Sequence, residues 1–255
     1  MDIFAKVQHI RSRIIGRLSL QHKILTLFVG STTLILLFSV FFIGTRAKNN
    51  SIENAHKQIG IIADKNTEYI QSLFEKELYI ARTLSSTTLN HRLLPKEKQF
   101  EIFTSYYKEA LSNNPDIVAI WDSWELSYLD STYNKDYGRY KTTVWRENET
   151  IKSKLELASL NGDSQQYTRV KKEAKESLED PYFDTYENDP TKKMLMTSII
   201  VPNRINDKVA GFIGIDIPIA HYYDIFKQIK PYEGSYALLL SNSFKYVAAP
   251  DKDLI

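Results

Sequence analysis

The feature that most constrains this chain is a run of 21 residues without a charged side chain, from Ile24 to Gly44. At about 1.5 Å of rise per residue, a helix of this length spans the roughly 30 Å hydrocarbon core of a bilayer. Buried helices of soluble proteins rarely lack charges for so long, and no small-residue cleavage site of a signal peptide follows the run. We therefore predict an uncleaved transmembrane helix over residues 24–44.

Charges on the two sides of this run predict its orientation. The segment before it carries five basic side chains and one acidic one, whereas two basic side chains after it are soon followed by an acidic one. These residues are Lys6, Arg11, Arg13, Arg17 and Lys23 against Asp2 before the run, and Arg46, Lys48 and Glu53 after it. The positive-inside rule places residues 1–23 in the cytoplasm and the rest outside a bacterial inner membrane, with a single visible span.

The stretch after the apolar run has the pattern of a long amphipathic helix. Apolar residues recur from Ile52 to Leu84 at spacings of three, four and seven, with no proline and only Gly60 as a glycine. We predict a stalk helix over residues 45–90 that continues out of the membrane. It is either an inert spacer or a rigid connection that carries a displacement towards the membrane.

A mixture of helices and strands follows. The pattern predicts a helix over 95–111, a strand over 117–126, a strand over 140–145 within a polar stretch, a turn at 161–163 and a helix over 166–179. These elements indicate an α+β fold.

The clearest strand signal is a pair of apolar runs, "KMLMTSIIVPN" (193–203) and "KVAGFIGIDIPI" (208–219), joined by a polar turn at 206–207. This is the pattern of an antiparallel hairpin. A helix is expected over 220–231 and a further hairpin with its turn at 242–243. Because an isolated hairpin is only marginally stable, we expect the sequence to stop inside a second module of a longer protein.

One aspartate, Asp216, interrupts the second apolar run. Strand alternation places it on one face with Phe212, Gly214 and Pro218, and places four isoleucines on the other. A buried carboxylate is unfavourable unless it is paired or hydrogen-bonded. Gly214 is expected to leave space beside it, which would suit a small cationic group such as an amine. The alternative is a structural aspartate that caps the next helix or pairs with an arginine.

Aromatic side chains gather between Trp121 and Trp145. Aromatic rings combined with carboxylates can surround an ammonium group through cation–π attraction, worth about 0.5–2 kcal/mol each. The alternative is that about half of them pack in the core. Alternation places Trp121 and Trp124 on opposite faces of their strand, so we do not expect both to line one pocket.

In this order, "NPDIVAIW", "EDPYFD", "MLMTSIIVPN" and "VAGFIGIDI" resemble the N-terminal part of a double Cache domain. Such domains are the extracytoplasmic sensors of bacterial chemoreceptors and sensor histidine kinases. The resemblance covers about residues 45–255. It implies a membrane-distal, PAS-like Cache module with an antiparallel sheet over 91–230, which binds the ligand, and the start of a membrane-proximal module over 231–255. It also implies a homodimer formed through the stalk helix.

In the amino-acid-binding branch of this family, an Arg-x-Trp-Tyr motif holds the ligand carboxylate and a terminal strand aspartate holds its amine. Tyr167 and Asp216 match this pattern, whereas Ser164 and Gln166 replace the arginine and the tryptophan. "WDSWELSYLD" and "YGRY" resemble instead a Cache variant with Trp-Glu, Leu-Asp and Gly-Arg, in which Arg139 could replace the missing guanidinium. The resemblance thus implies a ligand site drawn from Asp216, Tyr167, Tyr182, Trp124, Glu125, Asp130, Arg139 and Tyr140.

Composition narrows the function further. The chain has no cysteine, so disulfides and thiolate metal sites are excluded, and its net charge of +2 does not indicate a nucleic-acid partner. No nucleophile, phosphate-loop or metal-ligand motif occurs, so we expect neither catalysis nor a cofactor in the visible chain. We expect a transmembrane signal receptor for a small amine or amino-acid-like molecule. The alternative is a membrane-anchored adhesion or scaffold domain that senses nothing.

Overall fold

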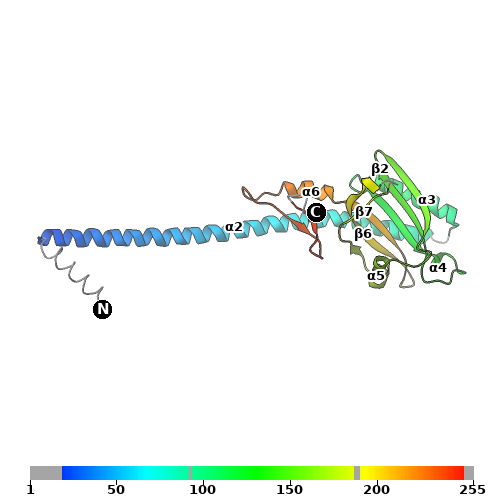
Figure 1. Cartoon of the computed structure of the whole chain (residues 1–255), viewed down its shortest axis with the longest axis horizontal. Helices are drawn as coiled ribbons and strands as arrows, with labels where there is room; N and C mark the ends of the chain where they lie inside the picture. Colours follow the sequence, from blue (N-terminus) through cyan, green and yellow to red (C-terminus); the bar gives the residue numbers. More distant parts are fainter. Residues whose placement is uncertain (1–18, 92–93, 187–189, 250–255) are drawn as a thin grey trace. The chain divides into compact units, whose positions relative to one another are not determined.

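A computed structural model describes residues 19–91, 94–186 and 190–249 (Figure 1). The chain divides into two units, Met1–Asp64 and Lys65–Ile255. Helix α2 (Leu20–His91) contains the ranges predicted as the membrane span and the stalk. It is long and apolar enough to cross a membrane, and its most apolar segment is not buried. The basic residues from Lys6 to Arg17 lie outside the described residues.

The second unit is built on an antiparallel sheet of seven strands in the order β3-β2-β1-β7-β6-β4, with β5 also paired to β6. The helices and strands are α3 (Lys96–Ser112), β1 (Ala119–Glu125), α4 (Leu126–Leu129), β2 (Arg139–Glu147), β3 (Thr150–Ala158), α5 (Gln165–Glu173), β4 (Ser177–Leu178), β5 (Tyr182–Asp184), η1 (Pro190–Lys192), β6 (Met194–Ile205), β7 (Lys208–Pro218), α6 (Ala220–Lys227), β8 (Leu239–Leu240) and β9 (Tyr246–Ala248). The predicted α+β, PAS-like sheet is confirmed.

The predicted hairpin forms the centre of this sheet. Strands β6 and β7 are joined by Asn206 and Asp207, whose φ angles of 49° and 63° lie in the left-handed region. Asparagine and aspartate tolerate this region better than other residues with a side chain, so the turn forms where the sequence predicts it.

The two faces of the sheet are covered by different helices (Figure 1). On one face, Ile213, Ile215 and Ile217 belong to the main core with apolar residues of α2 after Lys65 and of α3. On the other face, Tyr167 and Val170 of α5 pack with Ile200 and Phe212. The predicted isoleucine face is therefore the core face, and we call the opposite side the α5 face.

Two elements differ from the sequence prediction. Helix α5 ends at Glu173, not at residue 179, because Ala174 adopts a left-handed conformation with φ of 52°. Residues Ser177 and Leu178 then pair with β6 as strand β4. Strand β3 was not predicted, because it lies at the sheet edge and has too few buried residues for a strong apolar signal.

The last described elements follow β7. Tyr222 and Phe226 of α6 and Val247 and Ala248 of β9 are buried in the same core as the isoleucine face. The strands β8 and β9 form a separate two-stranded sheet around the predicted turn at 242–243. Residues 250–255 lie outside the described residues, and the expected module boundary near residue 230 stays a prediction.

Candidate ligand-binding site

Asp216 lies near the C-terminal end of β7, between Ala119 of β1 and Ser198 of β6. It is 1% exposed, and its register places it on the α5 face together with Gly214 and Phe212. Its side chain does not cap α6, which has no side-chain hydrogen bond at its N-terminus. It also forms no ion pair with any described residue, so neither structural role that the sequence left open applies.

Among the described residues, only neutral groups donate hydrogen bonds to the Asp216 carboxylate. The indole N–H of Trp121 lies 3.1 and 3.0 Å from its two oxygens, and the Ser198 hydroxyl lies at 2.5 Å. The hydroxyl of Tyr186 also donates to it, and the Tyr182 hydroxyl lies at 3.4 Å. We call these five residues the Asp216 cluster. Within it the Tyr182 and Ser198 hydroxyls are 2.6 Å apart.

Burial raises the pKa of Asp216 above its ordinary value. The hydrogen bonds from Ser198, Tyr186 and Trp121 and the charge of Lys141 act in the opposite direction and do not cancel this effect. The free carboxylate is therefore hydrogen-bonded but short of positive charge.

Gly214 does not leave the expected open space. A Cβ atom at this position would collide with the indole ring of Trp121, which covers the glycine. The ring of Trp145 stacks on Tyr186 with centroids 6.1 Å apart. Asp216 thus lies among aromatic rings, and the glycine admits one of these rings where we had expected a gap.

A second group on the α5 face brings together three of the predicted residues. Glu125, 1% exposed, accepts hydrogen bonds from the Tyr167 hydroxyl at 2.7 Å and from Lys171 at 2.9 Å. The guanidinium of Arg139 lies 3.6 Å from the centre of the Tyr167 ring and pairs with Asp163 at 3.3 Å. Unlike Asp216, Glu125 has a cation of the protein beside it.

The remaining predicted residues lie elsewhere. Trp124 is 1% exposed in the main core, and Tyr140 packs against that core, so both are on the opposite face from Asp216. The expectation that Trp124 neighbours Asp216 is wrong, because the alternation that separates it from Trp121 places Trp121 at the carboxylate. Asp130 accepts hydrogen bonds from the backbone and hydroxyl of Thr132 in a local turn.

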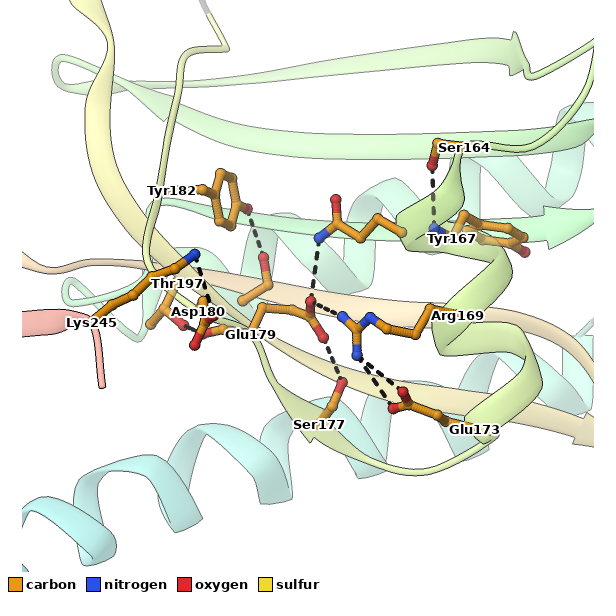
Figure 2. A network of polar contacts seen from close by, with 12 residues as sticks. Ser164, Tyr167, Arg169, Glu173, Ser177, Glu179, Asp180, Tyr182, Thr197 and Lys245 are labelled. Atoms are coloured by element: carbon orange, nitrogen blue, oxygen red, sulfur yellow. Dashed lines mark hydrogen bonds and ion pairs between the residues drawn. The ribbon is translucent and has the colours of Figure 1, made fainter. Parts of the chain in front are cut away.

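Figure 2 shows a third polar group, centred on Glu179. Its carboxylate accepts hydrogen bonds from Arg169 at 2.6 Å, Ser177 at 3.0 Å and Gln166 at 3.3 Å. Arg169 also pairs with Glu173 at 3.3 Å, and its guanidinium lies between the two carboxylates (Figure 2). We call these five residues the Glu179 network. The network includes Gln166, the residue at the position where the family motif has tryptophan.

The short segment around Glu179 also reaches other parts of the unit (Figure 2). The Thr197 hydroxyl donates to the backbone carbonyl of Glu179 at 2.6 Å, and Asp180 pairs with Lys245 at 3.3 Å. Tyr182, three residues after Glu179, belongs to the Asp216 cluster. The segment therefore lies between α5, the turn before β9 and the buried aspartate.

No protein-family model and no curated protein matches the sequence. Solved structures do match. The extracellular domain of mmHK1S-Z3, a protein described as a histidine kinase, has a TM-score of 0.58 at 22% identity and covers 73% of this chain and 67% of its own. This chain has the fold of that extracellular domain. Methyl-accepting Chemotaxis protein X has a TM-score of 0.56 at 20% identity, covering 82% and 78%.

A ligand-binding domain that was solved with its ligand bound shows the same fold. The domain of the Campylobacter jejuni chemoreceptor Tlp3, in complex with L-valine, has a TM-score of 0.54 at 14% identity and covers 82% of this chain and 75% of its own. These likenesses confirm the sensor-domain fold that the sequence resemblance implied.

Proposed function

We propose that this chain is a transmembrane receptor of a bacterial inner membrane whose extracytoplasmic sensor domain binds a small molecule through a cationic amine. Its signal passes to a cytoplasmic output domain, as in chemotaxis or two-component signalling. The observation that carries this proposal is the Asp216 carboxylate, which is buried among aromatic rings and receives hydrogen bonds only from neutral donors in the described part of the chain.

The physical reason is the cost of an uncompensated buried charge. A carboxylate removed from water is unfavourable until a positive charge or hydrogen bonds replace its hydration. A ligand ammonium would supply that charge, and the faces of Trp121, Trp145 and Tyr186 would add cation–π attraction. L-valine, bound by Tlp3, carries such an ammonium group and is the kind of molecule that we propose for this site.

The proposed membrane arrangement follows the sequence. Residues 1–23 lie in the cytoplasm, 24–44 cross the bilayer, 45–90 form the stalk, 91–230 form the ligand-binding module and residues from 231 begin a second module. Two copies associate through the stalk. Cysteines introduced one at a time over residues 52–84 should cross-link with helical periodicity, and a flat profile would count against this dimer. We assign no catalytic activity, cofactor or nucleic-acid partner to the chain.

An adhesion or scaffold domain is the competing function, and the complete hydrogen bonding of Asp216 favours it. In that case the Asp216 cluster is only a structural element of the α5 face. The two functions differ in what the carboxylate does for a cationic ligand, which a charge-removing substitution measures directly.

The test uses the full chain in nanodiscs and a calorimetric panel of amines and amino acids. Asp216→Asn keeps the shape and removes the charge, so it should weaken binding by about 1.5–3 kcal/mol, the range of a hydrogen bond to a charged group. Asp122→Asn is the matched control, because Asp122 is equally buried but lies on the core face. Unchanged affinity in Asp216→Asn, or no binding by the whole panel, would support the scaffold function.

A further inference from the structure

The cations around the α5 face differ in whether the protein itself pairs them. Three are held by carboxylates: Arg139 by Asp163, Lys171 by Glu125, and Arg169 by Glu179 and Glu173. Lys141 is half-buried and forms no ion pair with any described residue. Its ammonium instead lies 5.6 Å from the centre of the Trp121 ring.

Lys141 is close to Asp216 through a single shared neighbour. Trp121 donates its N–H to the Asp216 carboxylate and presents its ring to Lys141. The positive charge of Lys141 is also felt at Asp216, where it lowers the pKa of the carboxyl. The indole therefore lies in contact with an unpaired cation and with an anion that has no cationic partner.

A second unpaired donor lies beside Lys141. Ser123 is its direct cross-strand partner on β1 and is 1% exposed. The Ser123 hydroxyl is buried and has no hydrogen-bond partner among the described residues. A buried hydroxyl without a partner is unfavourable, so an acceptor arriving from outside would be stabilised there.

We propose that Lys141, with the Ser123 hydroxyl beside it, binds the anionic group of a zwitterionic ligand whose amine is held at Asp216. This inference rests on the proposed function and specifies the ligand class of the same site. The family resemblance suggests Arg139 for this role, but Arg139 is held by Asp163 and Tyr167. At the two motif positions that this chain replaces, Ser164 and Gln166 are neutral, and the nearby Arg169 is held by Glu179.

Electrostatics favour a zwitterion over a simple amine at this site. An α-amino acid carries its ammonium and its carboxylate on the same carbon atom, so it would bring a positive charge to Asp216 and a negative charge towards Lys141. A simple amine would bring its positive charge close to Lys141 with nothing to neutralise the lysine. Discrimination would thus come from repulsion of the amine as well as attraction of the carboxylate.

The test compares matched probes on the full chain in nanodiscs. L-valine carries both charged groups, isobutylamine lacks the carboxylate and isovalerate lacks the ammonium, and the other standard amino acids are measured with their decarboxylated amines. Lys141→Met should weaken amino-acid binding about 10- to 100-fold and leave or improve binding of the amines. Lys141→Arg should restore most of the affinity. Lys152→Met is the control, since Lys152 is an exposed lysine on the neighbouring strand.

The outcomes separate this inference from the proposed function. If the amines bind as tightly as the amino acids, or if Lys141→Met weakens both classes equally, the inference is overturned while the amine-binding function stands. If no probe binds, both are overturned. Selective loss of amino-acid binding in Lys141→Met, with the control unchanged, supports the inference.

Discussion

Two buried carboxylates beside α5, those of Asp216 and Glu179, are handled in opposite ways. Glu179 is 8% exposed and Asp216 is 1% exposed, and each accepts several hydrogen bonds. Glu179 is paired with the guanidinium of Arg169, whereas the donors to Asp216 are an indole and hydroxyls. The protein thus pairs Glu179 with a cation, whereas Asp216 has no cationic partner among the described residues.

A third carboxylate shows that neutral donors alone do not identify a ligand site. Asp122 is fully buried and accepts hydrogen bonds from the Tyr107 hydroxyl at 2.8 Å and the Thr142 backbone N–H at 2.9 Å. Tyr107 belongs to α3, which covers the core face. The distinction of Asp216 is therefore its combination of neutral donors with aromatic rings and an unpaired lysine on the α5 face.

The largest effect on the free energy of unfolding is expected for Glu179, the carboxylate that is paired with Arg169. Glu179→Gln removes a charge-assisted bond from Arg169, so the free energy of unfolding should fall by about 1.5–3 kcal/mol. The control is Glu176→Gln, which breaks an exposed pair with Arg82 and should cost about 0–1 kcal/mol. Urea unfolding of the ligand-free chains measures both. Equal losses of unfolding free energy in the two variants would show that the Glu179–Arg169 pair stabilises the fold no more than an exposed ion pair does.

A smaller loss is expected where the Asp216 cluster is packed. Gly214→Ala places a methyl group against the Trp121 ring, and overpacking of this kind costs about 1–3 kcal/mol. The displaced indole would also weaken ligand binding. Gly60→Ala is the opposite control, since nothing surrounds that glycine and alanine favours its helix by up to about 1 kcal/mol. If Gly214→Ala leaves the free energy of unfolding unchanged, the close packing of Trp121 on the glycine is contradicted.

A further effect concerns the pH dependence of stability that Asp122 contributes. Burial raises the pKa of Asp122 from 3.8 to about 6, so the folded state binds this proton more tightly than the unfolded state. The group therefore stabilises the fold below about pH 4, and this contribution is lost as the pH rises through about 6. In the Asp122→Asn variant, the melting temperature should no longer show this pH dependence between about pH 4 and 6. If the melting temperature of the variant follows the same pH profile as that of the unmodified chain, the raised pKa of Asp122 is contradicted.

The sequence predicted the central hairpin because its turn residues and apolar runs agree, and it placed Asp216 on the correct face because alternation is strict within a strand. It could not identify Ser198 as a neighbour. Counting back from the turn pairs Ser198 with Ile215, but a register shift between Asn203 and Arg204 moves it opposite Asp216.

Other parts of the site depended on tertiary structure. Trp121 neighbours Asp216 because β1 pairs with β7, a contact between segments 95 residues apart that no local pattern specifies. Alternation predicted that Trp121 and Trp124 lie on opposite faces of the strand. It could not predict which aromatic ring covers Gly214, because that depends on the order of the strands in the sheet. Lys171 and Asp163 were missed because their ordinary polar context gives no signal until Glu125 and Arg139 are placed beside them.

The most direct test of the central claim is the unfolding free energy of Asp216→Asn near neutral pH, without and with a saturating ligand from the panel. We predict that the ligand-free variant is as stable as the unmodified chain or more stable, because the hydroxyls of Ser198 and Tyr186 can rotate to suit the amide. Saturating ligand should stabilise the unmodified chain by about 2.7 kcal/mol at 100 times its Kd, and the variant by much less. A ligand-free loss as large as that of Glu179→Gln, with ligand stabilisation unchanged, would show that Asp216 is a structural residue.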